Sequence, residues 1–216
     1  MSGCSSTATL IRRFTPVQLL AHLLLAVTFF VMLWTGLCLY FPALAEIMNR
    51  PTAKRWHLWA AAGLGIGLLI LIAINRRSFG QVVREVDSFD RNDTTWLRGG
   101  LRRVFNHEGA PEQGWWNAGQ KINTAVTMGL MVVLTFTGLL LWIGEQNTAY
   151  RFKGTVDVHD LATILIVILT CGHLYLALIN PATRAATRGI VTGSVDREWA
   201  RRNHQRWVRD TEAKID

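Results

Sequence analysis

The chain has 216 residues, of which 50% are hydrophobic and 18% charged, and its mean hydropathy is +0.21. A soluble domain of this size usually carries about a quarter charged residues. The apolar residues gather in four dense blocks, which excludes a soluble enzyme, a disordered chain and a disulfide-stabilised scaffold. The net charge is +8. In a soluble protein such a charge indicates nucleic acid binding, whereas in a membrane protein the position of the basic residues indicates which loops face the cytoplasm.

Four segments are long and apolar enough to cross a bilayer, which takes about 20 mostly apolar residues. They cover about residues 17–41, 57–74, 122–143 and 159–179. We therefore predict an all-α fold, an integral membrane four-helix bundle that forms a single membrane domain over residues 1–216. The first segment is too long for a signal peptide, so we expect it to be retained. We expect no internal repeat.

The basic residues lie mainly on one side of these four spans. Eighteen of the 23 Lys and Arg residues belong to the N-terminal segment, to the loop 75–121 or to the tail 180–216. By the positive-inside rule, both termini, this loop and the tail are expected in the cytoplasm. The excess of basic residues then reports topology and contact with anionic membrane lipids, and no nucleic acid partner is expected. The five on the other side are Arg50, Lys54, Arg55, Arg151 and Lys153.

Four of the six histidines stand near the ends of apolar spans, whereas His107 and His204 lie in polar segments and are expected to be solvated. The four are His22, His57, His159 and His173. An ionisable side chain inside a membrane is costly, so each is a candidate functional residue. The topology sorts them into a cytoplasmic-side pair, His22 with His173, and an outer-side pair, His57 with His159. For any one of them, a hydrogen bond to a neighbouring helix is the alternative.

The spacing on the fourth span favours two stacked haem groups. Fourteen residues separate His159 from His173, which is about 21 Å along a helix and a return to nearly the same face. This distance excludes one four-histidine zinc site, and imidazole is a common axial ligand of haem iron. There is no C-x-x-C-H motif for covalent haem attachment. Glycines offer room for a flat macrocycle, Gly36 above all, although small-residue helix packing also explains them.

Four segments of the chain resemble those of a known protein family. They are RRFTPVQLLAHLLLAVTFFVMLWTGL around His22, AKRWHLWA around His57, WWNAGQKIN, and VHDLATILIVILTCGHLYLAL with His159 and His173. In these segments the chain resembles the gamma subunit, of cytochrome b556 type, of respiratory formate dehydrogenase, within the four-helix dihaem cytochrome b family. The late NHQRWVRD resembles the family's H-P-R-W-Y tail, with Gln205 in place of the proline and Val208 in place of the tyrosine. The resemblance covers nearly the whole chain.

The resemblance implies two haem b groups, with the iron ligands His57/His159 and His22/His173. It also implies a site for menaquinone or ubiquinone near the cytoplasmic side, formed by Asn117, Gly119 and Gln120 close to His173. Amide side chains can donate hydrogen bonds to a quinone carbonyl. The alternative is a plain helix start with Asn117 as its cap. Lys121 is expected to steer the quinone or to pair with a lipid phosphate.

The implied function is electron transfer from an outer-side iron–sulfur beta subunit to quinone, in a respiratory complex with a molybdenum or tungsten catalytic alpha subunit. The expected location is the bacterial inner membrane. Formate dehydrogenase is the first expectation for this complex. The alternatives are a cytochrome b subunit of a nickel–iron hydrogenase or other molybdoenzyme, a cytochrome b561-type ascorbate or superoxide-linked oxidoreductase, and a haem-free membrane anchor or proton-relay transporter. No residue of this chain is expected to be catalytic beyond quinone reduction.

Overall fold

The structure, a computed structural model, describes residues 10–105 and 109–213. Within these residues four helical segments are long and apolar enough to cross a membrane. They are Pro16–Tyr40, Arg50–Ile74, Ala118–Gln146 and Thr155–Ile179. The predicted all-α fold with four membrane-spanning helices is therefore confirmed. The chain divides into two compact units, residues 14–82 and residues 10–13 together with the described part of 83–213.

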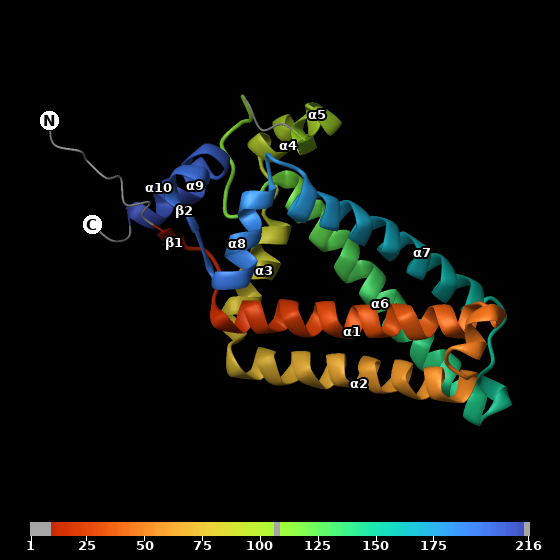
Figure 1. The fold of residues 1–216 in the computed structure, drawn as a ribbon. Coiled ribbons are helices and arrows are strands. Elements are labelled where there is room, and N and C mark those ends of the chain that lie inside the picture. Colours follow the sequence, from red (N-terminus) through yellow and green to blue (C-terminus); the bar gives the residue numbers. More distant parts are fainter. Residues whose placement is uncertain (1–9, 106–108, 214–216) are drawn as a thin grey trace, which may run out of the picture. The chain divides into compact units, whose positions relative to one another are not determined.

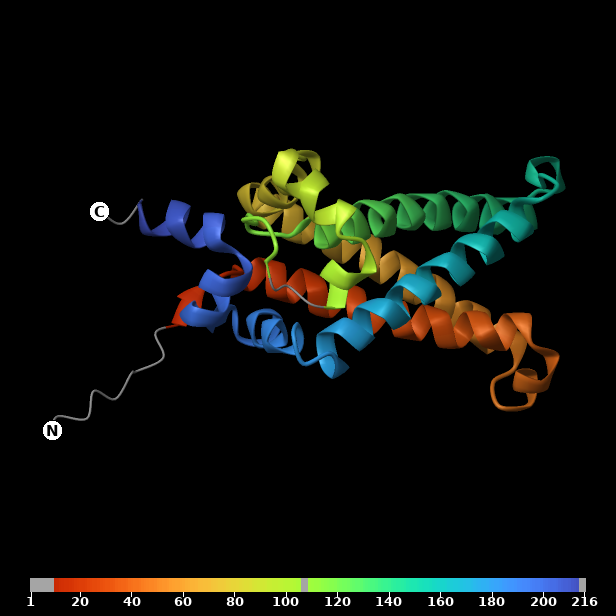
Figure 2. The same ribbon diagram turned by 90° about the horizontal axis from the view of Figure 1, so that it is seen from above.

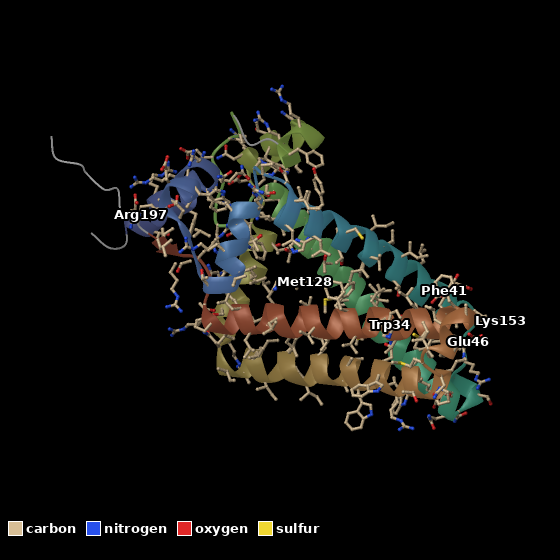
Figure 3. The ribbon with its side chains drawn as sticks, in the orientation of Figure 1. Trp34, Phe41, Glu46, Met128, Lys153 and Arg197 are labelled. Carbon is tan, nitrogen blue, oxygen red and sulfur yellow. The ribbon has the colours of Figure 1, made fainter. Side chains whose placement is uncertain are left out.

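The unit 14–82 is a helical hairpin. Helix α1 (Pro16–Tyr40) is followed by the short 3₁₀ helix η1 (Pro42–Glu46) and by α2 (Arg50–Ile74), which packs along α1. Phe41 and Glu46 mark the end where the two helices are joined (Figure 3). At the other end the Thr15 hydroxyl caps α1 and lies 3.0 Å from the Ser78 hydroxyl, so the start of α3 (Arg76–Asp87) is tied to the start of α1.

Helix α2 begins seven residues before the apolar run that predicts it. Asn49 caps it by accepting a hydrogen bond from the backbone NH of Thr52, and a proline lies in the first turn. These are strong helix-start signals. Hydropathy alone places the start at His57 because Arg50, Lys54 and Arg55 lower the local average, although charged side chains are tolerated at a helix end.

The second unit contains another helical hairpin (Figure 1). Helix α6 (Ala118–Gln146) continues through η2 (Thr148–Tyr150) into α7 (Thr155–Leu174), which ends in one π-helical turn, η3 (Tyr175–Ile179). Gly154, at φ +82°, makes the turn into α7, a conformation that favours glycine.

The polar segments of this unit form short helices and one small sheet, and α4 (Arg91–Arg98) packs against α6. Helices α4 and α5 (Leu101–Phe105) precede α6, and the tail contains η4 (Arg184–Ala186), α8 (Thr187–Thr192), α9 (Arg197–Asn203) and α10 (Gln205–Glu212). Strand β1 (Leu10–Arg12) pairs antiparallel with β2 (Ser194–Asp196), and α9 lies against both (Figures 1 and 2). A small apolar core holds them together, formed by Ile11, Val195, Ala200 and Val208.

Candidate functional site

His57, on α2, is held by the facing turn of α1. Its Nδ1 lies 3.1 Å from the hydroxyl of Thr35 and 3.1 Å from the backbone carbonyl of Met32. The Thr35 hydroxyl in turn donates to the carbonyl of Val31, at 2.7 Å. Gly36 stands beside the ring, and a Cβ at this position would lie 3.7 Å from His57 Cε1. Nδ1 of the ring therefore has its hydrogen-bond partners on α1, next to a residue without a side chain.

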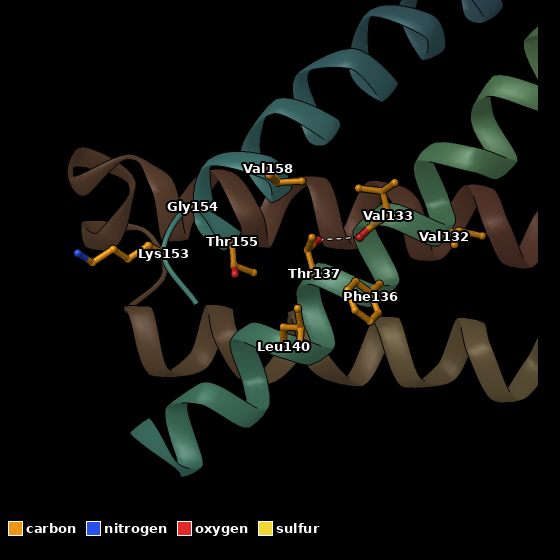
Figure 4. Close-up of a pocket in the computed structure, with 9 residues that line it drawn as sticks. All are labelled: Val132, Val133, Phe136, Thr137, Leu140, Lys153, Gly154, Thr155 and Val158. Carbon is orange, nitrogen blue, oxygen red and sulfur yellow. Dashed lines mark hydrogen bonds between the residues drawn. The ribbon is translucent and has the colours of Figure 1, made fainter. Parts of the chain in front are cut away.

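His159, on α7, has the same surroundings within the second hairpin. Its Nδ1 lies 2.8 Å from the hydroxyl of Thr137 on α6. That hydroxyl donates to the carbonyl of Val133 at 2.7 Å (Figure 4). Gly138 follows, and a Cβ there would lie 3.5 Å from His159 Cε1. In each hairpin a Thr-Gly pair on the first helix thus holds a histidine on the second.

The two hairpins are an internal repeat with a constant offset of 102 residues, so the expectation of no repeat is wrong. The histidine follows its threonine by 22 residues in both hairpins. Side-chain identity outside these positions is low because both helices need only be apolar, and this hides the repeat. The pairs at this offset are Thr15/Asn117, both capping residues, Gln18/Gln120, both completing a capping box, Thr35/Thr137, Gly36/Gly138 and His57/His159.

Each hairpin also has a pocket beside its threonine. The pocket in the second hairpin has a volume of about 450 Å³ (Figure 4), and the one in the first has about 410 Å³. Five residues of each lining correspond at the 102-residue offset, which extends the repeat from sequence to shape. The corresponding lining residues are Phe30/Val132, Val31/Val133, Trp34/Phe136, Thr35/Thr137 and Trp56/Val158.

The other two candidate ligands do not follow the repeat. His22 lies on α1 and His173 near the end of α7. The residues at the 102-residue offset are Thr124 for His22 and Leu71 for His173. Each of these two histidines therefore occurs in one hairpin only, without a histidine at the equivalent position of the other hairpin.

The motif Asn117–Gln120 forms the start of α6, as the capping alternative predicts. The Asn117 side chain accepts from the backbone NH of Gln120 at 2.9 Å, and the Gln120 side chain accepts from the backbone NH of Asn117 at 3.0 Å. Both bonds use amide oxygens, so the cap does not use the NH₂ donors that a quinone carbonyl requires. Gly119 makes room for Trp96, since a Cβ would lie 2.8 Å from the Trp96 ring.

Lys121 is a buried cation one residue beyond this motif. Its side chain is 0% exposed, and its Nζ donates to Asp93 Oδ2 at 2.8 Å and to the carbonyl of Ser88 at 2.7 Å. Glu85 lies 3.9 Å away. The expected pairing of Lys121 with a lipid phosphate is wrong, because the ammonium is enclosed by protein groups. The pair Lys121–Asp93 instead holds α4 against the start of α6.

His204 is also buried, contrary to the expectation of a solvated residue, and is 1% exposed. Its Nδ1 lies 2.8 Å from the carbonyl of Gly114, which can only accept, so Nδ1 carries the proton. Its Nε2 lies 3.0 Å from Arg13 Nη2, which can only donate. His204 is therefore neutral. Arg13 also donates to the carbonyl of Trp115 at 2.6 Å, so the N-terminal strand, the segment before α6 and the tail meet at one point.

Charge at this junction is shielded from water. Burial lowers the pKa of the Arg13 guanidinium to about 9, against the opposing effect of Glu85, so Arg13 remains a cation at neutral pH. Trp199 and Trp207 lie 5.5 and 5.7 Å from it, as rings suited to a cation. The proximity of these residues depends on tail docking, which no local motif reveals.

A second charged contact joins the tail to α4. Arg206, on α10, forms a hydrogen-bonded ion pair with Asp90, the cap of α4. Burial raises the pKa of Asp90, but the hydrogen bonds from Arg206 and from the backbone NH groups of Asp93 and Asn92 outweigh it and lower that pKa. The hydrogen bond to Asp90 raises the pKa of Arg206. His107 lies outside the described residues.

The chain is similar to known proteins over most of its length. A family model described as prokaryotic cytochrome b561 matches residues 13–193. The formate dehydrogenase cytochrome b556 subunit of Haemophilus influenzae is 26% identical over 215 residues, which is 95% of this chain and 85% of that protein. In Escherichia coli, the nitrate-inducible formate dehydrogenase cytochrome b556 subunit is 23% identical, over 96% of this chain and 94% of the relative. The formate dehydrogenase cytochrome b556(fdo) subunit is 25% identical, over 92% of both chains.

The matched region includes all four apolar helices and the four candidate histidines. Membership of this family implies binding of haem b. The chain belongs to the prokaryotic cytochrome b561 family and is a multi-pass electron-transport protein of the bacterial inner membrane.

Proposed function

We propose that this chain is the dihaem b membrane subunit of a respiratory dehydrogenase, which passes electrons from an outer-side iron–sulfur partner to quinone near the cytoplasm. The observation that carries the proposal is the repeated Thr-Gly and histidine arrangement, which gives each hairpin one equivalent imidazole. Two equivalent imidazoles, one from each hairpin, are the axial donor set of a bis-histidine haem.

The outer pair is His57 with His159, and the inner pair is His22 with His173. Both pairs take one residue from each hairpin. The surroundings of the outer pair suit a macrocycle, since Gly36 and Gly138 leave the side of each ring without a Cβ. When bound, haem would supply an iron that changes its oxidation state by one electron. The protein supplies ligands, spacing and an apolar environment.

The direction of electron flow rests on topology. With eighteen of 23 basic residues on the side of the termini, both termini lie in the cytoplasm. The quinone site is then on that side, at Asn117, Gly119 and Gln120, with His173 near it. The amide NH₂ groups of Asn117 and Gln120 would donate hydrogen bonds to a quinone carbonyl. The capping bonds use only the amide oxygens of these two side chains.

The partner complex is a formate dehydrogenase, with an iron–sulfur beta subunit and a molybdenum or tungsten alpha subunit. Support comes from the relatives, which carry that enzyme's name over nearly their whole lengths. A hydrogenase or another molybdoenzyme remains the alternative for the same membrane subunit. Mass spectrometry of the complex purified through this chain distinguishes them by the large subunit that accompanies it.

Redox difference spectroscopy tests the haem assignment. The purified wild-type chain should show b-type bands with two haems per chain. Replacing His159 with Ala should remove one haem, and replacing His22 with Ala should remove the other. Absence of b-type bands from the wild-type protein would refute the proposal. If the His159→Ala variant loses both haems while His57→Ala loses none, the pairing is wrong.

A further inference from the structure

We propose that Thr35 and Thr137 are positioning residues, which fix the tautomer and ring orientation of His57 and His159, and that His159 depends more strongly on its threonine. The inference rests on the proposed function, in that these two histidines hold iron. It goes beyond that function because it assigns a role to two hydroxyl groups that touch neither iron nor quinone.

The position of each hydroxyl proton follows from the hydrogen bonds. A threonine hydroxyl has one proton to donate. Thr137 Oγ1 lies 2.7 Å from the carbonyl of Val133, and Thr35 Oγ1 lies 2.7 Å from the carbonyl of Val31. A carbonyl oxygen cannot donate, so in both cases the hydroxyl proton points to its own helix, the usual arrangement for a threonine within a helix. The hydroxyl oxygen is then an acceptor toward the histidine.

The histidine must therefore donate from Nδ1. For His57 a second acceptor leads to the same result, since the carbonyl of Met32 also lies 3.1 Å from Nδ1. With the proton on Nδ1, the neutral imidazole carries its lone pair on Nε2. This is the tautomer that binds iron through Nε2 and is oriented through the other nitrogen. Burial supports this arrangement, as Thr35 is 1% and Thr137 6% exposed, so water does not compete for either hydroxyl.

The hydrogen bond also affects the electronic properties of the ligand. Donation from Nδ1–H makes an imidazole more basic at Nε2. A more basic axial ligand favours ferric over ferrous iron. Loss of the threonine hydroxyl should therefore raise the reduction potential of the outer haem and weaken its retention.

The two hairpins differ in the length of the hydrogen bond between histidine Nδ1 and the threonine hydroxyl, which makes the inference specific. Nδ1 of His57 has two acceptors, Thr35 Oγ1 and the Met32 carbonyl, both at 3.1 Å. Nδ1 of His159 has Thr137 Oγ1 at the shorter distance of 2.8 Å. After loss of Thr35 the Met32 carbonyl still accepts from His57. Loss of Thr137 removes the shorter and therefore stronger of the two threonine–histidine hydrogen bonds, so its effect should be larger.

The test compares Thr137→Val and Thr35→Val in the complete complex, by haem content per chain, potentiometric titration and low-temperature EPR. Valine matches threonine in shape and removes the hydroxyl. We expect Thr137→Val to raise one of the two potentials and shift one low-spin signal, with about tenfold weaker haem retention, the lower end of the range for such partners. Thr35→Val should act in the same direction by a smaller amount, and Thr137→Ser should restore the wild-type values.

Two threonines of the same helices serve as controls. Thr28 donates to the carbonyl of Leu24 at 2.7 Å and Thr135 to that of Met131 at 2.8 Å. Thr28→Val and Thr135→Val should leave both potentials unchanged. If Thr137→Val does not accumulate in the membrane, the smaller Thr137→Ala provides the same comparison.

Wild-type potentials, haem content and EPR signals in both Thr→Val variants would overturn the inference, as would a larger effect of Thr35→Val than of Thr137→Val. A wild-type protein without haem would overturn the proposed function itself, so the two failures are distinguishable.

Discussion

Replacing Lys121 with Met tests whether the buried ion pair at the start of α6 is essential to the fold. Methionine keeps most of the side-chain volume but removes the ammonium that contacts Asp93 at 2.8 Å and the Ser88 carbonyl at 2.7 Å. Asp93 is 1% exposed and cannot recover its solvation. Removing one partner of a buried ion pair costs about 3–5 kcal/mol, because the other charge stays buried and uncompensated.

We therefore expect Lys121→Met to lower the free energy of unfolding by about 3–5 kcal/mol. SDS-induced unfolding of the purified protein in mild detergent, followed by tryptophan fluorescence, measures this loss. Asp93→Asn should cost a similar amount for the same reason. The double variant should cost much less than the two single variants together, because it removes both charges of the pair.

The matched control is Lys153→Met, at the exposed connection between α6 and α7 (Figure 3). This change should be nearly neutral, as surface substitutions usually are. A loss below about 1 kcal/mol for Lys121→Met, or additive losses in the double variant, would refute the reasoning, since a desolvated pair must couple.

Three further changes test the polar part of the second unit. Gly119→Ala should lower the melting temperature, since its Cβ would lie 2.8 Å from the Trp96 ring and such overpacking costs about 1–3 kcal/mol. The control Gly129→Ala, whose Cβ meets nothing within 4 Å, should leave the melting temperature unchanged. Equal melting temperatures of the two variants would contradict this. His204→Ala should lower the free energy of unfolding by about 1–3 kcal/mol for each buried partner that loses its hydrogen bond, namely Arg13 and the Gly114 carbonyl. It should also speed hydrogen exchange in the tail. Replacement of the exposed Arg202 with Ala is the control. The Asp90–Arg206 pair should add stability that is complete above the ordinary Asp pKa of 3.8 and is lost as the pH falls through the lower folded pKa. Unfolding measured from pH 7 to 3 should show this loss in the wild type and a smaller one in Asp90→Asn; identical profiles would exclude the pair as its cause.

The spans could be predicted from the sequence because each depends on local properties. A run of about 20 apolar residues spans a bilayer whatever its neighbours are. The limits of the helices depend on capping groups as well, so α2 begins at Arg50, after the cap Asn49, and not at the first strongly apolar residue. The cap at Asn117 could be predicted for the same reason, since a side chain and the backbone NH three residues later define it.

The polar contacts that position the candidate site depend on distant residues. His204 is buried through Gly114 and Arg13, which are 90 and 191 residues away in the chain. Lys121 is buried by Asp93, on a helix that the sequence shows only as part of a polar loop. Charge and hydropathy describe each of these residues as solvent-facing, because neither quantity records which segments dock together.

The role proposed for Thr35 and Thr137 has a signal in the sequence that becomes visible only when the two hairpins are compared. Each begins a Thr-Gly pair, and a histidine follows the threonine by 22 residues both times. Threonine is common in membrane helices, where its hydroxyl bonds to its own backbone. Only the coincidence of spacing separates these two from Thr28 or Thr135.

The 102-residue repeat also has a consequence for how such a protein can arise. In the proposed function, a hairpin with one Thr-Gly pair and one histidine holds half of a bis-imidazole site, so two copies of one short gene product would suffice for a single haem. In the proposed function the second haem uses His22 and His173, at positions where the other copy has Thr124 and Leu71. A one-haem ancestor with two identical halves could therefore become a two-haem electron carrier by one substitution in each half. Joining the halves in one chain is what allows each to change on its own.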